Sequence, residues 1–410
     1  MKKLLLVLLI LSLFINHLNA NEKDLNIIQK DKKEYRLLDK ESIQTRQQSQ
    51  KYDWISPIDL SGNIGRNHSF SDENSRNLNN KNTKSASIGF TQSIFESGGI
   101  GFKMDYADNR FKYEMLSWEN QNSQLIYTIY NTLLDIKKLK LEINQNDYRI
   151  VNKDIELIIK KIQYEAGKTD IIELNNAIMS KNLILKEEIA LKNSLKEKEQ
   201  ELAKYTDLKY DEIEILDFKE TNKDIFLDKN YSILEADAKV EMLNSEYKIK
   251  KSQYLPKLSL SAKASYSNQD EKFNSMINDT NKDDATSSGS LILSMPLYDY
   301  TKSSKVQESK IEVLKQKALV NDLKNETVFE YEQIFTKIDT YLKQNETINK
   351  NIKLYEELIG ANKISSEAGM TSKYDLEILE NTKTINEFDI LINKINILQQ
   401  YAKLYFKIKN

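Results

Sequence analysis

Side chains able to carry out catalytic or metal chemistry are scarce in this sequence. It has no cysteine, and of its two histidines only His68 lies outside the first twenty residues. Thiolate and multi-histidine metal sites therefore lack ligands, disulfides are impossible, and acid–base catalysis lacks its usual residue. The sequence also has no nucleophile motif and no glycine-rich phosphate loop. These observations predict a protein that is not an enzyme and that has neither a resident cofactor nor a metal.

The most regular chemical feature is an acidic residue six positions after a glycine, which occurs twice. Glu173 follows Gly167, and Asp375 follows Gly369. Taken by themselves, both are first-turn acids, which the helix dipole favours.

The two acidic residues belong to a longer internal repeat. Residues 165–169 read Glu-Ala-Gly-Lys-Thr, and residues 367–371 read Glu-Ala-Gly-Met-Thr. A period of about 200 residues is much longer than that of a solenoid, so it indicates two copies of a domain-sized unit. Two more landmarks match in the same order: Ser93-Ile94-Phe95 with Pro296-Leu297-Tyr298, and residues 57–61 with residues 256–260.

Residues 1–20 have the pattern of a secretory signal. Lys2 and Lys3 precede the apolar run 4–14, which is too short to cross a bilayer, and Ala20 suits a cleavage site. A short anchor helix is the alternative. Loss of the two lysines would change the formal net charge from −2 to about −4, a balance that predicts no nucleic-acid binding. We therefore expect an exported protein.

Four short windows alternate apolar and polar residues with the period of a β-strand. Each is long enough to cross a bilayer at a tilt. The polar segments 65–83 and 267–289 would join the windows into two hairpins. The edge of a soluble β-sandwich is the alternative, but the rest of the chain has helical patterns and offers no second sheet. The expected strands are 57–66, 84–95, 256–267 and 288–298.

The remaining pattern predicts long helices, because 410 residues include only three prolines and ten glycines. Residues 102–165 and 300–367 would each form a helix roughly 95 Å long. Gly167 and Gly369 suit the left-handed position after these helices. Thr169 or Asp170, and Thr371 or Ser372, would then cap two return helices. Coiled-coil seams are expected along Ile171, Leu174, Ile178, Leu185 and Ile189, and along Leu376, Leu379, Ile390, Ile397 and Leu404.

The repeat divides the chain into consecutive segments. The signal peptide, residues 1–20, precedes a first structural repeat, 21–205, with a β-hairpin at 57–95 and a tip at 165–170. An inter-repeat equatorial segment covers 206–228. The second repeat, 229–410, has its β-hairpin at 256–298 and its tip at 367–372.

At this point the sequence resembles the TolC-like family of outer membrane efflux proteins, over essentially the whole exported chain. Residues 92–99 resemble the exit from a strand into a long helix, and residues 252–260 resemble a proline-led strand entry. Residues 165–174 and 367–376 resemble the two periplasmic hairpin tips. The resemblance implies a mainly α fold with a small transmembrane β part. Each protomer would contribute four strands to a trimeric 12-stranded barrel and long coiled-coil hairpins to a periplasmic tunnel.

The resemblance also implies a function, a passive exit duct of a tripartite efflux or type I secretion system. Its expected partners are outer-membrane lipid, a periplasmic adaptor (membrane fusion) protein and an inner-membrane RND or ABC transporter. A homotrimer agrees with physics, because eight strands fill their own interior whereas twelve leave a lumen. An open sheet edge is also not viable in lipid. The alternatives are a periplasmic coiled-coil adaptor and a structural or adhesin protein without a channel.

Several residues acquire expected roles from the resemblance. In relatives, contacts among a tyrosine, an arginine and acidic residues hold the tip closed. This chain has Ser366, Thr371 and Ile378 at the tyrosine, arginine and second acidic positions, so it lacks these contacts in that form. Tyr164 is the candidate gate contact instead. The remaining candidates are Gly167, Thr169, Gly369 and Thr371 for the tip turns and adaptor docking; Glu173 and Asp375 for an acidic ring at the periplasmic entrance; and Trp54, Phe95, Tyr254 and Tyr298 for an interface girdle, with junction packing as the alternative.

Overall fold

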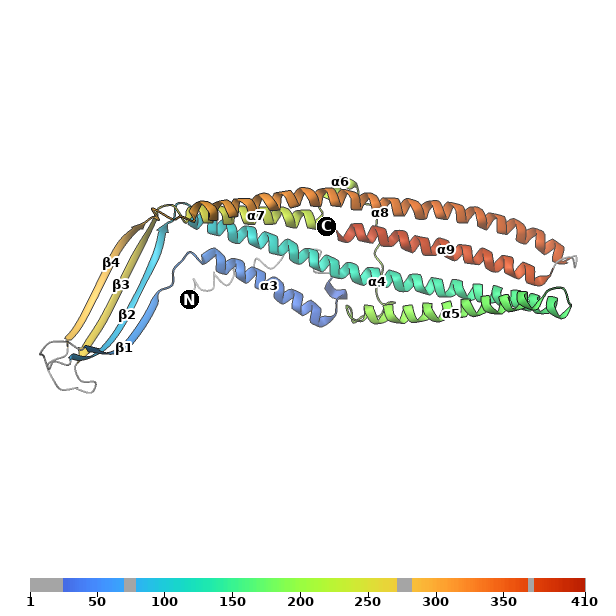
Figure 1. Cartoon of the computed structure of the whole chain (residues 1–410), viewed down its shortest axis with the longest axis horizontal. Helices are drawn as coiled ribbons and strands as arrows, with labels where there is room; N and C mark the ends of the chain where they lie inside the picture. Colours follow the sequence, from blue (N-terminus) through green and yellow to red (C-terminus); the bar gives the residue numbers. More distant parts are fainter. Residues whose placement is uncertain (1–24, 70–78, 271–281, 368–371, 410) are drawn as a thin grey trace, which may run out of the picture. The chain divides into compact units, whose positions relative to one another are not determined.

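The computed structural model describes residues 25–69, 79–270, 282–367 and 372–409. The expected signal peptide, Gly369 and Thr371 lie outside these ranges. Figure 1 shows the elements in chain order. They are η2 (Leu25–Ile27), α3 (Lys30–Tyr52), β1 (Asp59–Ser69), β2 (Asn79–Phe95), α4 (Gly99–Glu165), α5 (Ile171–Leu202), α6 (Lys223–Asp228), α7 (Tyr231–Ser252), β3 (Lys257–Asp270), β4 (Lys282–Ser294), α8 (Lys302–Glu367) and α9 (Lys373–Phe406).

The chain divides into two compact units, and each sequence repeat contributes to both. The sheet unit comprises residues 41–115 and 236–320. The helical unit comprises residues 116–235 and 321–410, together with the residues before 41. Among the helices of the described ranges, none is both long and apolar enough to cross a membrane.

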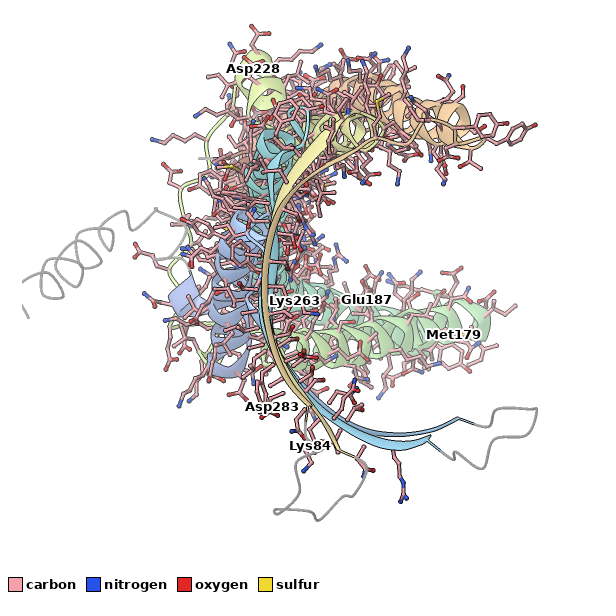
Figure 2. The ribbon with its side chains drawn as sticks, turned by 90° about the vertical axis from the view of Figure 1, so that its left-hand side faces the viewer. Lys84, Met179, Glu187, Asp228, Lys263 and Asp283 are labelled. Atoms are coloured by element: carbon pink, nitrogen blue, oxygen red, sulfur yellow. The ribbon has the colours of Figure 1, made fainter. Side chains whose placement is uncertain are left out.

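The sheet unit contains four antiparallel strands in the order β1-β2-β3-β4. As the windows predicted, β1 pairs with β2 and β3 pairs with β4. The pairing of β2 with β3 joins the two repeats, and a bulge lies between Ser93 and Phe95. Figure 2 shows the strands as one strongly curved band. The register fixes which side chains share a face, because successive residues of a strand point to opposite sides.

The strand ends differ from the sequence prediction. The structure extends β1 to Ser69 and β2 back to Asn79, so much of the expected loop 65–83 is strand. β3 and β4 likewise extend into the expected loop 267–289. Ladder hydrogen bonds need only the backbone, whereas the sequence alternation marks only the stretch in which one face is apolar. β4 ends at Ser294 rather than 298, because Pro296 has no N–H to donate to a ladder.

The two long helices are confirmed. The structure shows α4 with 67 residues and α8 with 66, starting within three residues of the expected positions. In the helical unit α4 lies between α5 and α9, as Figure 1 shows. Its contacts include a polar one on each side: the Asn146 side chain donates to the carbonyl of Ile184 on α5, and the Gln145 side chain donates to that of Ile385 on α9.

The first tip turn is built as the sequence predicted. Gly167 has φ of +69°, the left-handed conformation that a residue with a Cβ rarely adopts. The N–H groups of Gly167 and Lys168 donate to the carbonyls of Tyr164 and Gln163 at 2.9 and 2.8 Å. These bonds satisfy two carbonyls that the end of α4 would otherwise leave unpaired. Asp170, not Thr169, caps α5.

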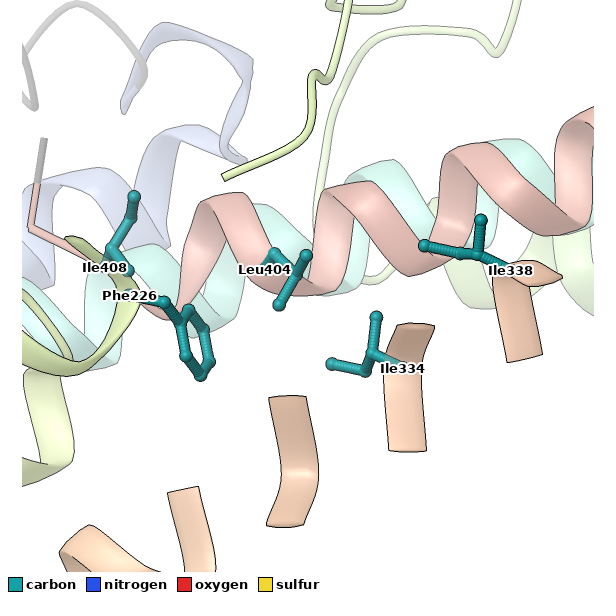
Figure 3. Packing of buried hydrophobic residues seen from close by; sticks show 5 residues of the cluster. All are labelled: Phe226, Ile334, Ile338, Leu404 and Ile408. Atoms are coloured by element: carbon teal, nitrogen blue, oxygen red, sulfur yellow. The ribbon is translucent and has the colours of Figure 1, made fainter. Parts of the chain in front are cut away.

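A hydrophobic core closes the opposite end of the helical unit. Phe226 from α6, Ile334 and Ile338 from α8, and Leu404 and Ile408 from the C-terminal segment pack together in Figure 3. Phe226 is completely buried. The expected equatorial segment 206–228 is therefore partly helical, because its apolar side chains are held by tertiary packing that a short irregular sequence pattern does not reveal.

Beside this core, Glu330 of α8 binds two lysines near the C-terminus, Lys403 of α9 and Lys407 just after it. The Lys403 Nζ lies 2.8 Å and the Lys407 Nζ 2.6 Å from the Oε1 atom of Glu330. Burial by itself would raise the pKa of Glu330, but the hydrogen bonds from both lysines outweigh that effect and hold the pKa below its ordinary value of 4.5. The carboxylate therefore ties α8 to the C-terminal segment as an anion.

We expect Glu330→Gln to lower the free energy of unfolding at neutral pH by about 1–2 kcal/mol. A pKa that is lowered by folding contributes stability above the ordinary value, and this contribution is lost as the pH falls through the lowered pKa. The difference between wild type and variant, measured by thermal unfolding at a series of pH values from about 7 downward, should therefore shrink as the pH falls below 4.5. Asp339→Asn, which removes the exposed pair with Lys343 on the same helix, is the control with little effect. A pH-independent difference for Glu330→Gln would contradict the assignment.

Gly167→Val should strain the tip turn by about 1–2 kcal/mol, because valine must adopt a positive φ there. This strain corresponds to an increase of about 5- to 30-fold in the population of molecules whose tip turn is locally unfolded. That population can be measured as the rate of limited proteolysis at the tip. Gly360→Val inside α8, where a new Cβ meets nothing within 4 Å, should leave cleavage unchanged. Equal cleavage of the two variants would show that the backbone at Gly167 does not require glycine.

Candidate functional site

One face of the sheet is lined with hydroxyl groups; we call it the hydroxyl face. Its side chains bond across strands: the Ser61 and Ser87 hydroxyls lie 2.8 Å apart, and those of Ser265 and Thr286 lie 2.7 Å apart. The hydroxyl-bearing residues of this face are Ser61, Ser85, Ser87, Thr91, Ser93, Ser259, Ser261, Ser265, Ser267, Thr286, Ser288 and Ser290. Such a surface is wettable, and its charged side chains include Asp59, Lys257, Lys263 and Asp284.

The opposite face, the apolar face, is the more exposed of the two. Leu60 is 80% exposed and Leu293 is 73% exposed, whereas Ser87 and Ser265 are half-buried. A protein surrounded by water shows the reverse arrangement. The apolar face comprises Leu60, Ile64, Ala86, Ile88, Phe90, Leu258, Leu260, Ala262, Ala264, Tyr266, Leu291 and Leu293. It requires an apolar environment outside the chain.

The four aromatic residues at the strand–helix junctions are placed differently from one another. Tyr254 is only 7% exposed, and Lys302 lies over its ring at 5.4 Å. Trp54 is half-buried. Phe95 and Tyr298 are both exposed, Tyr298 to 84%. The packing interpretation therefore describes Tyr254, whereas Phe95 and Tyr298 are free to meet a membrane interface.

The two acidic residues of the tips both have local partners. Glu173 forms an ion pair with Lys160 at 3.0 Å across the α4–α5 hairpin. Asp375 completes a capping box, in which its carboxylate accepts from the Ser372 N–H at 3.3 Å. Both are exposed. The interpretation as first-turn acids thus has direct support, and a ring would have to form in addition to these contacts.

Other tip candidates are placed only in part. Tyr164 is 42% exposed at the end of α4, and Thr169 is half-buried in the turn. Gly369 and Thr371 lie outside the described residues. The structure therefore describes one complete tip, at 165–170, and the capped start of α9 after the other.

The expected seam along α5 needs correction. Leu174 and Leu185 are half-buried, but Ile171, Ile178 and Ile189 are exposed. These apolar residues spread over two faces of α5, and only one face meets α4. The α9 stripe is confirmed, since its five residues are half-buried or buried. Further apolar side chains, including Leu354, Leu358 and Ile364, are exposed along α8.

Sequence reasoning missed two sets of charged or polar residues. Asp59 and Lys263 lie in one row of the hydroxyl face, a relation that only the register reveals. Asn152, which sequence analysis did not single out, bonds to Thr382 and Asn381 between α4 and α9. Within the described ranges, no group of three or more His, Asp or Glu side chains is placed to hold a metal.

Comparisons with known proteins agree with this geometry. Residues 224–403 match the family model of outer membrane efflux proteins. No curated protein matches the sequence. The CmeC outer membrane channel of Campylobacter jejuni is 13% identical with a TM-score of 0.69, covering 93% of this chain and 86% of that one. The outer membrane protein VceC of Vibrio cholerae is 13% identical with a TM-score of 0.70, covering 93% and 94%.

The open state of the MtrE outer membrane channel of Neisseria gonorrhoeae is also similar, at 12% identity and a TM-score of 0.68 over 94% of this chain and 88% of that one. These likenesses show a shared fold. The fold inferred from the sequence is thereby confirmed. The chain has the fold of TolC-like outer membrane factors, and its residues 224–403 carry the sequence pattern of the outer membrane efflux protein family.

Proposed function

We propose that the protein is the outer-membrane exit duct of a tripartite efflux or type I secretion system. The observation that carries this proposal is the inverted sheet, with an exposed apolar face and a hydroxyl-lined face. Lipid would cover the first face, and water with passing solutes would wet the second. Transport through such a duct is passive, so an inner-membrane transporter must supply the energy.

The two open edges of the sheet support a trimer. Within the described chain β1 and β4 each pair on one side only. Unpaired backbone groups are costly in lipid, so the edges must meet those of other copies. Three copies give twelve strands, enough for a closed barrel with a lumen.

The helical unit supports the same assembly. The long helices of this unit lie in the order α5-α4-α9-α8, as Figure 1 shows. The two outer helices, α5 and α8, carry exposed apolar residues. In a trimer, α8 of one protomer would cover α5 of the next, completing the coiled-coil seams expected from the sequence. The hairpins would then surround a periplasmic tunnel. A periplasmic adaptor or an adhesin would instead leave the apolar sheet face in water.

We assign the tips to adaptor docking and to the periplasmic entrance. Gly167 and Thr169 lie in the described tip, and the sequence repeat assigns Gly369 and Thr371 to the other. Both tips would then be available to a periplasmic adaptor that also holds an RND or ABC transporter. Tyr164 is the candidate gate contact. Phe95 and Tyr298 are the candidate interface aromatics that remain exposed.

The membrane assignment can be tested by cysteine labelling, since the chain has no native cysteine. Ile88→Cys and Leu260→Cys, on the apolar face, should react with lipid-soluble maleimides in outer membranes. Ser87→Cys and Ser259→Cys, on the hydroxyl face, should react with water-soluble ones, because the register places neighbouring residues on opposite sides. Ser87 with Ile88, and Ser259 with Leu260, are neighbours in the chain, so the two members of each pair lie at the same depth and differ only in the face of the sheet. The reverse pattern, or absence of the protein from outer membranes, would refute the proposed function.

Asp375→Asn tests the acidic ring. Three Asp375 carboxylates around a narrow mouth would repel one another and attract cations, so the variant should show lower cation selectivity in planar bilayers and weaker block by a trivalent metal. The effect should be modest, because Ile378 and Thr371 replace the second acid and the arginine of relatives. The amide oxygen of the new asparagine can still accept from the Ser372 N–H in the capping box, and Glu377→Gln, an exposed acid nearby on α9, is the control. Unchanged selectivity and block would leave Asp375 as a capping residue alone.

A further inference from the structure

The hydroxyl face has a polar pocket of about 440 Å³ in the first repeat's hairpin and the adjoining β3. Its floor is Gly89, where a Cβ would come within 3.0 Å of the Ala262 carbonyl oxygen. Hydroxyl groups line its sides, and Figure 2 labels Lys263 on the curved sheet. The lining residues are Ser56, Pro57, Asp59, Ser61, Ser87, Gly89, Phe90, Thr91, Ser261, Ala262 and Lys263.

Two opposite charges flank the floor of this pocket. The register runs Asp59, Gly89, Lys263, so the acid and the base are two strands apart in one row. With strands spaced about 4.8 Å, their backbones are roughly 9.6 Å apart. Because Gly89 has no side chain, nothing fills the space between them. Both side chains are exposed, and neither has an ion-pair or hydrogen-bond partner among the described residues.

The hydroxyl groups between these charges retain bonding capacity. Ser61 bonds to Ser87, and Thr91 donates to Ser261 at 3.1 Å. Each hydroxyl has one donor hydrogen and two acceptor lone pairs, so a pair joined by one bond still offers one donor and several acceptors. The pocket can therefore bind a polar molecule along its length as well as at its charged ends.

We propose that this pocket is a subsite for zwitterionic solutes of the size of a short peptide. The ammonium group would face Asp59, the carboxylate would face Lys263, and the peptide groups between them would bond to the hydroxyls. An extended chain spans about 3.3–3.6 Å per residue, so a tripeptide reaches across the separation of about 10 Å. The inference rests on the proposed function insofar as the hydroxyl face lines the duct that such solutes would enter.

The geometry favours a solute with both charges over one with a single charge. A simple anion would gain from Lys263 but be repelled by Asp59 in the same row, and a simple cation would meet the opposite problem. A zwitterion of matching length satisfies both. The interactions are solvent-exposed, so binding is weak and each charge contributes a small factor.

The test uses purified protein in detergent micelles and ligand-observed NMR. The probes are triglycine, N-acetyl-triglycine, which keeps only the carboxylate, and triglycinamide, which keeps only the ammonium group. Wild type should bind triglycine most tightly. Lys263→Gln should weaken triglycine and N-acetyl-triglycine by about two- to fivefold but not triglycinamide, and Asp59→Asn should weaken triglycine and triglycinamide but not the acetylated probe.

Matched controls exist on the same face. Lys257→Gln and Asp284→Asn remove charges outside the pocket and should change no affinity. The exchange variant Asp59→Lys with Lys263→Asp should bind triglycine again in the reverse direction. Equal affinity of wild type for the three probes, or equal losses in the control variants, would overturn the subsite. If triglycine does not bind while the protein still forms channels in planar bilayers, the subsite alone fails; absence of channels counts against the duct itself.

Discussion

The rest of the structure depends on one constraint, the need to cover a sheet that is apolar on its exposed face and open at both edges. Burying the apolar face contributes favourable free energy only in an environment without water. Pairing the edge strands is required in the same environment, because lipid offers the backbone no hydrogen-bond partners. Neither requirement is met by a single chain in water.

The helical unit also has apolar side chains that the single chain leaves uncovered. α4 has neighbours on both sides, and its contacts include buried Gln145, Asn146 and Asn152. Buried amides need bonding partners of defined geometry, so they fix how the α4–α5 and α8–α9 hairpins align. α5 and α8 keep apolar side chains exposed, and these gain stability only from further copies or partners.

Charged side chains are a minority on the hydroxyl face, which would line the proposed duct. The tip acids Glu173 and Asp375 already have local roles, in an ion pair with Lys160 and in the capping box of α9. A duct that must release what it conducts benefits from weak, distributed contacts rather than from strong fixed charges. In this setting, one row with opposite charges across a glycine stands apart from the rest of the sheet.

The sequence by itself determined the classes of element and much of their order. Scarcity of proline and glycine, period-two alternation and the Gly167 turn are local signals, so the long helices, the strands and the first tip could be predicted. Tertiary structure alone decided where the strands end, that α6 forms around buried Phe226, and that three of the five residues of the α5 stripe stay exposed. It also decided that Asp59 and Lys263 share a row and that Glu173 meets Lys160. The physical reason is that these features depend on pairing and packing between segments far apart in the chain, which local residue patterns do not encode.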